Sequence, residues 1–212
     1  MDKMAGEYLD RTAWTELRLR ELHALVEPKE GDRIVDLGCA AGALTHYFSG
    51  FGATVVGVDF EELAVTKARS LFPALRFEQA SVTQMPLEDH SFDKAVAGDL
   101  VEHLDHDTFC AMLEEVKRVL VPGGSLSIYT PNPLHLIERL KERNLILAQN
   151  PTHIGLRTAD ELTRLMREYG YTVDRAGWAA SFFPGLKQVE TVLGKRFQLF
   201  RYRLALRALT PV

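Results

Sequence analysis

A glycine-containing turn is the first stretch of this chain whose residues could do chemistry. Residues 34–45 read IVDLGCAAGALT, in which an apolar run leads into Gly38, Cys39, Ala40 and Gly42. Gly38 lets the backbone turn without a Cβ clash, and Gly42 lets helix and loop approach closely. An apolar strand that enters such a turn and then a helix is typical of a nucleotide-binding βαβ unit.

The charge of this turn indicates which nucleotide fits. The dinucleotide fingerprint G-x-G-x-x-G is absent because Ala40 and Ala43 occupy its second and third glycine positions. Asp36 stands just before the first glycine, where a carboxylate would repel a pyrophosphate and would suit a cationic group such as an amine. The turn therefore favours a nucleoside with a positively charged arm over a dinucleotide.

Residues that follow the next predicted strands are candidates for holding the nucleoside. Asp59 ends the run VVGVD and could accept hydrogen bonds from both ribose hydroxyls, or could cap the helix that begins at Glu61. Phe60 offers a flat apolar face for a base. Ser81 could bond an adenine edge or be an ordinary loop serine.

Asp99, Glu102 and His103 form a second group with chemical potential. If their segment is helical, the i, i+3, i+4 spacing places them on one face. His103 could then act as a general base. Alternatively, the three could bind a divalent cation with His153 or His106 as a further ligand. A third interpretation leaves His103 as a structural residue with a local hydrogen bond.

The composition excludes several classes of protein. The chain has 212 residues, 46% of them hydrophobic and 25% charged, with a net charge of -4 and a pI of about 6.0. A general nucleic-acid binder is usually basic, so no nucleic-acid partner is expected. We find neither an apolar leader nor a run of roughly 20 apolar residues. Cys39 and Cys110 lack metal-finger spacing, so we expect reduced thiols and a cytoplasmic protein.

Alternating strands and helices must position these residues. The apolar periodicities predict strands over residues 33–36, 54–59, 75–79, 92–97, 125–129 and 171–178. They predict helices over 5–27, 42–50, 61–72 and 134–147, one capped by Asp107 or Thr108, and one behind the capping box Thr158-x-x-Glu161. This order favours an α/β, three-layer Rossmann-like fold, with a mostly parallel sheet and helices on both faces. Ligands then bind beyond the carboxyl ends of the strands.

The tail after residue 181 admits two interpretations. A loose helical period runs through Val189, Val192, Leu193, Phe197 and Phe200, whereas residues 200–207 alternate apolar side chains with arginines as a strand would. Because an arginine-lined strand is unsuited to a sheet centre, we favour a helix. The basic, aromatic composition suits contact with a lipid-linked substrate, a homodimer or a solvated surface.

Four motifs in this order resemble the class I S-adenosylmethionine-dependent methyltransferases: IVDLGCAAGALT, VVGVD, FDKAVAGDLVEHL and EVKRVLVPGGSLSIYTPN. The resemblance covers roughly residues 30 to 180 and implies S-adenosyl-L-methionine as the cofactor. Ala40 departs from the family's commoner middle glycine. Ser81 stands where many members carry an aspartate for the adenine amino group, which puts that contact in doubt.

The resemblance also implies roles for individual residues. Asp36 and the turn from Gly38 to Gly42 would hold the methionine part, and Asp59 would hold the ribose. The remaining implied cofactor contacts are Phe60 and Val82 on the adenine, Asp99 and Leu100 beside the methionine chain and sulfonium, and Tyr8 and Arg11 closing over the cofactor.

Together these features predict methyl transfer to an oxygen or nitrogen atom of a small-molecule acceptor by in-line displacement. His103, Glu102 and His153 are the candidate catalytic residues, with a divalent metal at Asp99, Glu102 and His103 as the less favoured option. The competing functions are a cofactor-binding module without transfer activity and an NAD(P)-dependent oxidoreductase.

We expect residues 1–212 to form a single methyltransferase domain. Its parts are an N-terminal helical cap (1–30), a cofactor-binding core (31–130), an acceptor-site lid (131–157) and a C-terminal part (158–212). The lid is rich in Leu and Ile, which indicates a partly apolar acceptor or simple packing of the lid onto the sheet. Asn132 and His135 are further candidates to line the acceptor site.

Overall fold

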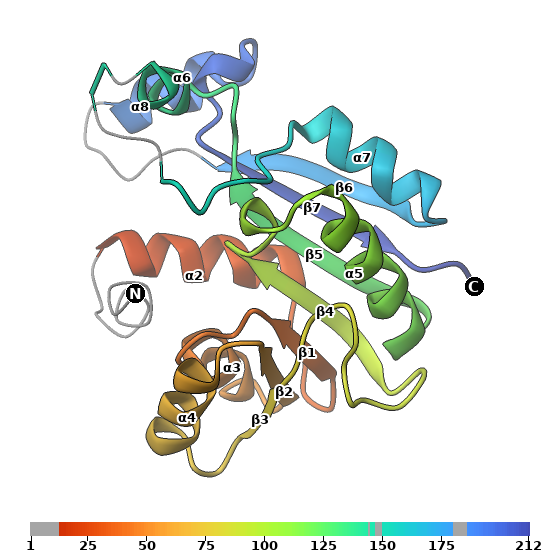
Figure 1. Ribbon diagram of the computed structural model, residues 1–212. Coiled ribbons are helices and arrows are strands. Elements are labelled where there is room, and N and C mark those ends of the chain that lie inside the picture. The colour runs from red at the N-terminus through yellow and green to blue at the C-terminus, as the bar shows by residue number, and fades with distance from the viewer. Residues whose placement is uncertain (1–12, 144, 147–149, 180–185) are drawn as a thin grey trace.

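A seven-stranded sheet with the order β3-β2-β1-β4-β5-β7-β6 forms the middle layer of the protein (Figure 1). The structure is a computed structural model that describes residues 13–143, 145–146, 150–179 and 186–212. The strands are β1 (Arg33–Leu37), β2 (Thr54–Asp59), β3 (Arg76–Gln79), β4 (Phe92–Gly98), β5 (Leu120–Pro131), β6 (Thr172–Ala179) and β7 (Arg203–Leu209). Strands β1 to β5 pair in parallel, and β7 runs antiparallel to both β5 and β6.

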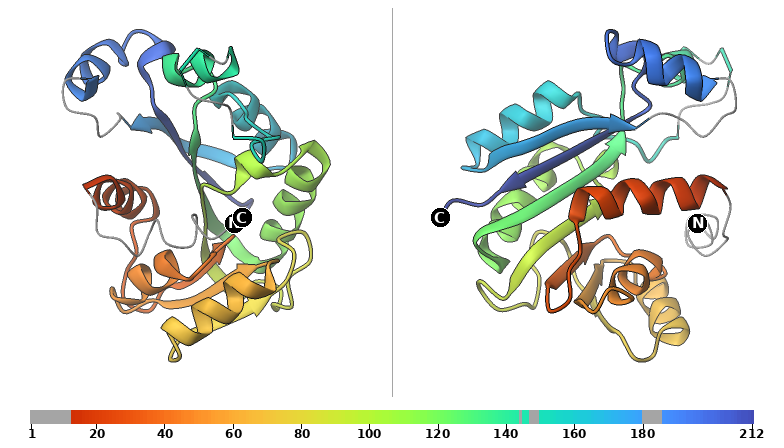
Figure 2. Two further views of the ribbon diagram at one scale, coloured as in Figure 1. Left: turned by 60° about the vertical axis from the view of Figure 1, so that its left-hand side comes forward. Right: turned by 180° about the vertical axis from the view of Figure 1, so that it is seen from behind.

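Helices cover both faces of this sheet, which confirms the predicted α/β architecture (Figure 2). The helices are α2 (Ala13–Val26), α3 (Ala43–Ser49), α4 (Glu62–Leu71), α5 (His106–Val119), α6 (Leu136–Glu142), α7 (Ala159–Glu168) and α8 (Leu186–Leu193). Two short 3-10 helices, η1 (Val101–His103) and η2 (Gln198–Phe200), complete the described elements. No helix among the described residues has the length and apolar character needed to cross a bilayer.

The alternation of side chains along β1 shows how the layers form. Val35 and Leu37 belong to the apolar core that contains the buried faces of α5 and α7. Ile34 belongs to the opposite core, which it shares with Leu22 of α2 and Phe48 of α3. Because successive side chains of a strand point to opposite faces, the one apolar run serves both layers.

The predicted cap of α5 was wrong by two or three residues. Asp105, rather than Asp107 or Thr108, occupies the cap position, and its side chain accepts a hydrogen bond from the Thr108 backbone N–H at 2.8 Å. The predicted capping box of α7 is confirmed, because the side chains of Thr158 and Glu161 each accept a hydrogen bond from the backbone N–H of the other residue.

The favoured helix was also wrong for the end of the tail. Residues 186–193 are helical, but Arg203–Leu209 form β7, the seventh strand of the sheet, which the sequence did not make obvious. Leu204 and Leu206 pack into the core. Arg203 instead pairs with Asp99, and Arg207 pairs with Asp174 and Glu27. Carboxylates from distant segments therefore make an arginine-bearing strand acceptable inside the sheet.

Helices α6 and α8 lie side by side beyond the carboxyl end of β5 (Figures 1 and 2). The buried side chains of His135, just before α6, and Glu190 of α8 are joined by a hydrogen bond of 2.9 Å. Asn132 donates to the carbonyl oxygens of Gln198 and Arg201 at 3.1 and 2.7 Å. His135 and Asn132, two candidates to line the acceptor site, both hold the tail in this structure, and their role at the acceptor site stays a prediction.

Candidate active site

The turn after β1 adopts the left-handed backbone that its glycines permit. The φ angles are 68° at Gly38, 46° at Ala40 and 82° at Gly42. A Cβ on Gly42 would lie 2.7 Å from the Phe77 ring, and one on Gly38 would lie 2.8 Å from a Leu100 methyl carbon. Both glycines thus permit close contacts and a backbone that larger residues rarely adopt.

Asp36 lies buried beneath this turn with half of its carboxylate unused. Oδ2 accepts a hydrogen bond of 2.7 Å from Thr45 Oγ1, while Oδ1 is buried without a hydrogen-bond partner among the described residues. Burial raises the pKa of the Asp36 carboxyl to about 7. An orphaned buried acceptor suits a cationic donor, so the site fits the amino group of the predicted cofactor.

Asp59 organises both the turn and the start of α4. Its Oδ2 accepts from the Ala40 N–H and its Oδ1 from the Glu61 N–H, each at 2.9 Å. A carboxylate oxygen has two acceptor sites, so these bonds leave capacity for two ribose hydroxyls. Capping and ribose binding therefore do not exclude each other here. The neighbouring Phe60 side chain is 73% exposed and accessible to a base.

For Ser81 and Val82, the other predicted adenine contacts, the structure gives only their burial and local hydrogen bonds. Val82 is buried, and Ser81 Oγ lies 2.7 Å from Thr83 Oγ1 within its own loop. The roles of Ser81 and Val82 stay predictions. Tyr8 and Arg11 lie outside the described residues.

The predicted helical face of Asp99, Glu102 and His103 does not form. Only Val101–His103 are helical, and Asp99 precedes them with a φ of 56°. The buried Asp99 carboxylate pairs with Arg18 of α2 and Arg203 of β7. These two arginines turn Asp99 away from a shared face with Glu102 and His103, and sequence analysis missed both. Arg18 carried a usable signal, because it lies four residues before the buried Leu22 and so on the same helical face.

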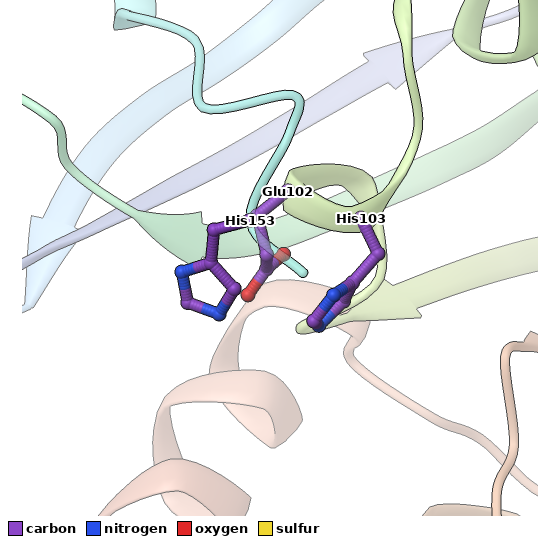
Figure 3. Close-up of side chains that lie close together, drawn as sticks. All are labelled: Glu102, His103 and His153. Carbon is purple, nitrogen blue, oxygen red and sulfur yellow. The ribbon is translucent and has the colours of Figure 1, made fainter. Parts of the chain in front are cut away.

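The structure brings Glu102 and His103 together with His153 instead (Figure 3). One ligand atom from each of these side chains lies within 4.8 Å of the other two. Glu102 is buried and accepts a 3.0 Å hydrogen bond from Thr130 Oγ1, with Arg203 Nη1 at 3.8 Å from its other oxygen. His103 Nδ1 lies 3.1 Å from the Thr152 carbonyl oxygen.

Burial sets the charge of this cluster. Burial lowers the pKa of His103 below its usual range. Burial, with a smaller contribution from the nearby His103, lowers the pKa of His153 to about 4. Burial also raises the pKa of Glu102, against the attraction of Arg203. Both imidazoles are therefore neutral at pH 7, and each offers one nitrogen lone pair. His106, the other proposed histidine, is exposed and lies 3.8 Å from Cys110.

The strand order and the polar residues beyond the strand ends define a Rossmann-like nucleoside-binding protein. Residues 34–124 match the family model described as "Methyltransferase domain". A chain from the complex of the Haloferax volcanii Trm112 methyltransferase activator with a methyltransferase has the same fold. Its TM-score is 0.73 at 19% identity, with coverage of 100% of this chain and 96% of that one.

Curated relatives carry the same family name. A Mycobacterium tuberculosis protein named "Probable S-adenosylmethionine-dependent methyltransferase" is 32% identical over 74% of this chain and 54% of its own length. "O-methyltransferase resE" of Aspergillus sclerotiorum is 28% identical over 75% of this chain and 62% of its own. The predicted membership of the class I S-adenosylmethionine-dependent methyltransferases is confirmed. This chain spans only about half to two thirds of these relatives' length.

Proposed function

We propose that this chain transfers the methyl group of S-adenosylmethionine to an oxygen or nitrogen atom of a small-molecule acceptor by in-line displacement. One observation carries the proposal: the glycine turn and the Glu102, His103 and His153 cluster lie at the same edge of the sheet. The turn follows β1 and the cluster follows β4, and these strands are parallel neighbours. Cofactor and acceptor groups held there would meet without crossing the sheet, which provides the proximity that displacement requires.

Residues of the glycine turn and of the strand ends beside it would hold the cofactor, which supplies a methyl group on a sulfonium sulfur when bound. The buried Asp36 carboxylate receives the amino group, and the backbone of Gly38, Cys39, Ala40 and Gly42 encloses the methionine part. Asp59 receives the ribose hydroxyls. The remaining proposed contacts are Phe60, Ser81 and Val82 at the adenine and Asp99 and Leu100 beside the methionine chain.

The cluster would hold the reacting atom of the acceptor. That oxygen or nitrogen forms the bond to the methyl carbon, and the electron pair of the broken carbon–sulfur bond returns to sulfur. The acceptor's proton must leave as the bond forms. A lone pair of neutral His103 or His153 can take it, because burial keeps both rings unprotonated at pH 7.

The lid supports an acceptor with an apolar part. Of its six Leu and Ile side chains between residues 134 and 146, none is buried, and Leu145 and Ile146 are 64% and 49% exposed. Leu134, Ile137 and Leu140 are half-buried, so packing of the lid leaves apolar surface on Leu136, Leu145 and Ile146. The Aspergillus relative is named an O-methyltransferase, which supports oxygen as the acceptor atom. A homodimer and a cytoplasmic location stay predictions, as does the single-domain division.

A ligand-binding experiment distinguishes the proposed methyltransferase from an NAD(P)-dependent oxidoreductase. Thermal shift should show stabilisation by S-adenosylmethionine and by S-adenosylhomocysteine but not by NAD, since ligands that bind the folded state raise its melting temperature. Stabilisation by NAD alone would overturn the proposal.

A methyl-transfer assay distinguishes the proposed methyltransferase from a cofactor-binding module without transfer activity. Methyl-labelled S-adenosylmethionine is incubated with a panel of phenols, catechols, carboxylic acids and amines. We expect label in at least one class, and a rate at least about 100-fold lower in His103→Ala, as general-base removal costs 10²–10⁴-fold. His106→Ala, on a nearby exposed histidine, should react normally. Cofactor binding without label transfer across the panel would favour the binding module.

A further inference from the structure

The two histidines of the Glu102, His103 and His153 cluster each have one ring nitrogen that lacks a hydrogen-bond partner in the part of the chain that the structure describes. His103 Nε2 and His153 Nδ1 are both buried and have no hydrogen-bond partner among the described residues. The two rings lie edge to face, with centroids 5.0 Å apart. A buried nitrogen without a partner costs roughly 1–3 kcal/mol, so two in one place indicate a missing ligand.

The tautomer of His103 identifies what kind of ligand is missing. Its Nδ1 faces the Thr152 carbonyl oxygen at 3.1 Å, and a carbonyl oxygen can only accept. Nδ1 therefore carries the hydrogen, and Nε2 is left with a lone pair that points toward Glu102 and His153 (Figure 3). A backbone carbonyl on the far nitrogen is the usual partner of a metal-binding histidine, because it fixes the ring and its tautomer.

The two segments that carry the cluster are fastened to each other. The Gly155 N–H donates to the Glu102 carbonyl oxygen at 2.9 Å. The buried Arg157 guanidinium donates to the carbonyl oxygens of Val101, Leu104 and Asp105 at 2.8 to 3.0 Å. A Cβ on Gly155 would lie 1.8 Å from the Leu104 carbonyl oxygen, so only glycine allows this approach. His153 is thus held near η1 by contacts that do not involve its own side chain, which preorganises the cluster.

We propose that Glu102, His103 and His153 bind one divalent transition-metal ion, with Asp99 outside the ligand set. Two imidazoles and one carboxylate suit zinc, iron, cobalt or manganese, whereas magnesium and calcium prefer oxygen ligands throughout. Three protein ligands leave a position open, as in catalytic rather than structural sites. The ion would occupy the lone pairs of His103 and His153 and hold an acceptor oxygen where the reacting atom is proposed to lie. In place of a histidine base, it would lower the pKa of the bound hydroxyl, so that the proton leaves to water. That catalytic role rests on the proposed function, but metal binding does not.

Metal titration of the protein, first dialysed against EDTA, tests this site without an acceptor. Calorimetry with Zn²⁺ should give one ion per chain, and Co²⁺ should develop the visible absorption of a coordinated ion. His153→Ala and Glu102→Gln should each weaken Zn²⁺ binding by more than about 100-fold, since losing even an outer hydrogen-bond partner of a ligand costs 10–100-fold. His106→Ala should bind as the parent does.

Affinity for S-adenosylhomocysteine, measured on each metal-free variant, shows that the fold is intact. Glu102→Gln keeps the shape and the Thr130 contact, so it separates metal loss from misfolding. Absence of stoichiometric binding, or binding unchanged in both Glu102→Gln and His153→Ala, would overturn the metal site. Cofactor affinity would stay intact in that case. Failure of the proposed function would instead appear as loss of cofactor binding or transfer while Zn²⁺ still binds.

Discussion

Two parts of this molecule, here called the cofactor half and the acceptor half after their proposed roles, place their site residues through bonds that span different distances along the chain. In the cofactor half, β1 to β4, Asp36 bonds a residue 9 positions away and Asp59 bonds one 19 positions away. In the acceptor half, from Asp99 to the end of β7, His135 bonds Glu190 over 55 positions. Arg203 reaches back over 104 positions to Asp99. The bonds around the glycine turn are therefore local, whereas the bonds that hold the tail and Asp99 join distant segments.

The two halves also differ in which buried polar atoms lack a hydrogen-bond partner and in how much apolar surface is exposed. The cofactor half has one orphaned acceptor, Asp36 Oδ1, beside a turn whose shape its glycines fix. In the acceptor half, His103 Nε2 and His153 Nδ1 lack a hydrogen-bond partner within the described part of the chain, and Leu136, Leu145 and Ile146 of the lid are exposed. A single cationic group satisfies the first site. The second site needs both a ligand for its lone pairs and apolar surface to cover the lid, so its specificity depends on several elements at once.

Breaking the buried pair in the acceptor half should have the largest effect. Glu190→Ala leaves the buried Nε2–H of neutral His135 without its Glu190 acceptor, and an unsatisfied buried donor costs up to about 3 kcal/mol. We expect this loss in the free energy of unfolding measured with urea. Affinity of the folded variant for S-adenosylhomocysteine should be unchanged, because the turn side does not contact α8. Glu190→Gln retains an acceptor for His135 Nε2–H and should lose much less. Equal stability of Glu190→Ala and the parent would contradict this view of the two halves.

Breaking the cofactor half should affect binding more than stability. Asp59→Ala removes the acceptor of the Ala40 and Glu61 N–H groups and of the proposed ribose hydroxyls. Hydrogen bonds to a charged group contribute about 1.5–3 kcal/mol, so affinity for S-adenosylhomocysteine should fall by about 100-fold in calorimetry. Glu62→Ala removes an exposed carboxylate from the first turn of α4 and is the matched control. A normal affinity in Asp59→Ala would remove Asp59 from the cofactor site.

The pH dependence of cofactor binding sharpens the role of Asp36. Its pKa is raised to about 7 by burial, so the free protein is increasingly protonated below pH 7. A cationic amino group favours the carboxylate form, so binding below pH 7 releases a proton and weakens as the pH falls. Affinity for S-adenosylhomocysteine should therefore rise by up to about tenfold per pH unit toward pH 7. Asp36→Asn should bind weakly with no such slope, and an affinity that falls as pH rises would exclude the ammonium contact.

The smallest effect is expected where the N-terminal helix meets the far edge of the sheet. Hydrogen bonds from Arg175 of β6 and Arg207 of β7 lower the pKa of Glu27 to about 2 from its ordinary 4.5. Because the folded pKa is depressed, this stabilisation is complete above about pH 4.5 and is lost as the pH falls toward 2. The parent should exceed Glu27→Gln in stability at pH 7 by no more than about 1 kcal/mol, because the pair is half exposed. The difference should vanish near pH 2, and a constant difference would show that the charge is not its source.

Much of the cofactor half could be predicted from the sequence. Short stretches of sequence are enough to predict the glycine turn, the acid that ends β2 and the apolar strands. The reason is that each strand and the loop after it are neighbours in the chain. Asp36, Gly38 and Asp59 therefore lie at the predicted strand ends. The capping box of α7 was equally accessible, since its two bonds join residues three positions apart.

The acceptor half was decided by tertiary structure. Asp99 has the spacing of a partner for Glu102 and His103, yet two arginines from α2 and β7 pair with it, and His153 takes the neighbouring place. The residues of β7 alternate as a strand does, but their arginines are tolerated only because Asp99, Asp174 and Glu27 lie opposite them. A residue pattern specifies which way a side chain faces along its own element. Which charge or ligand it then meets depends on segments as far as 180 residues away, and only the packed sheet brings those together.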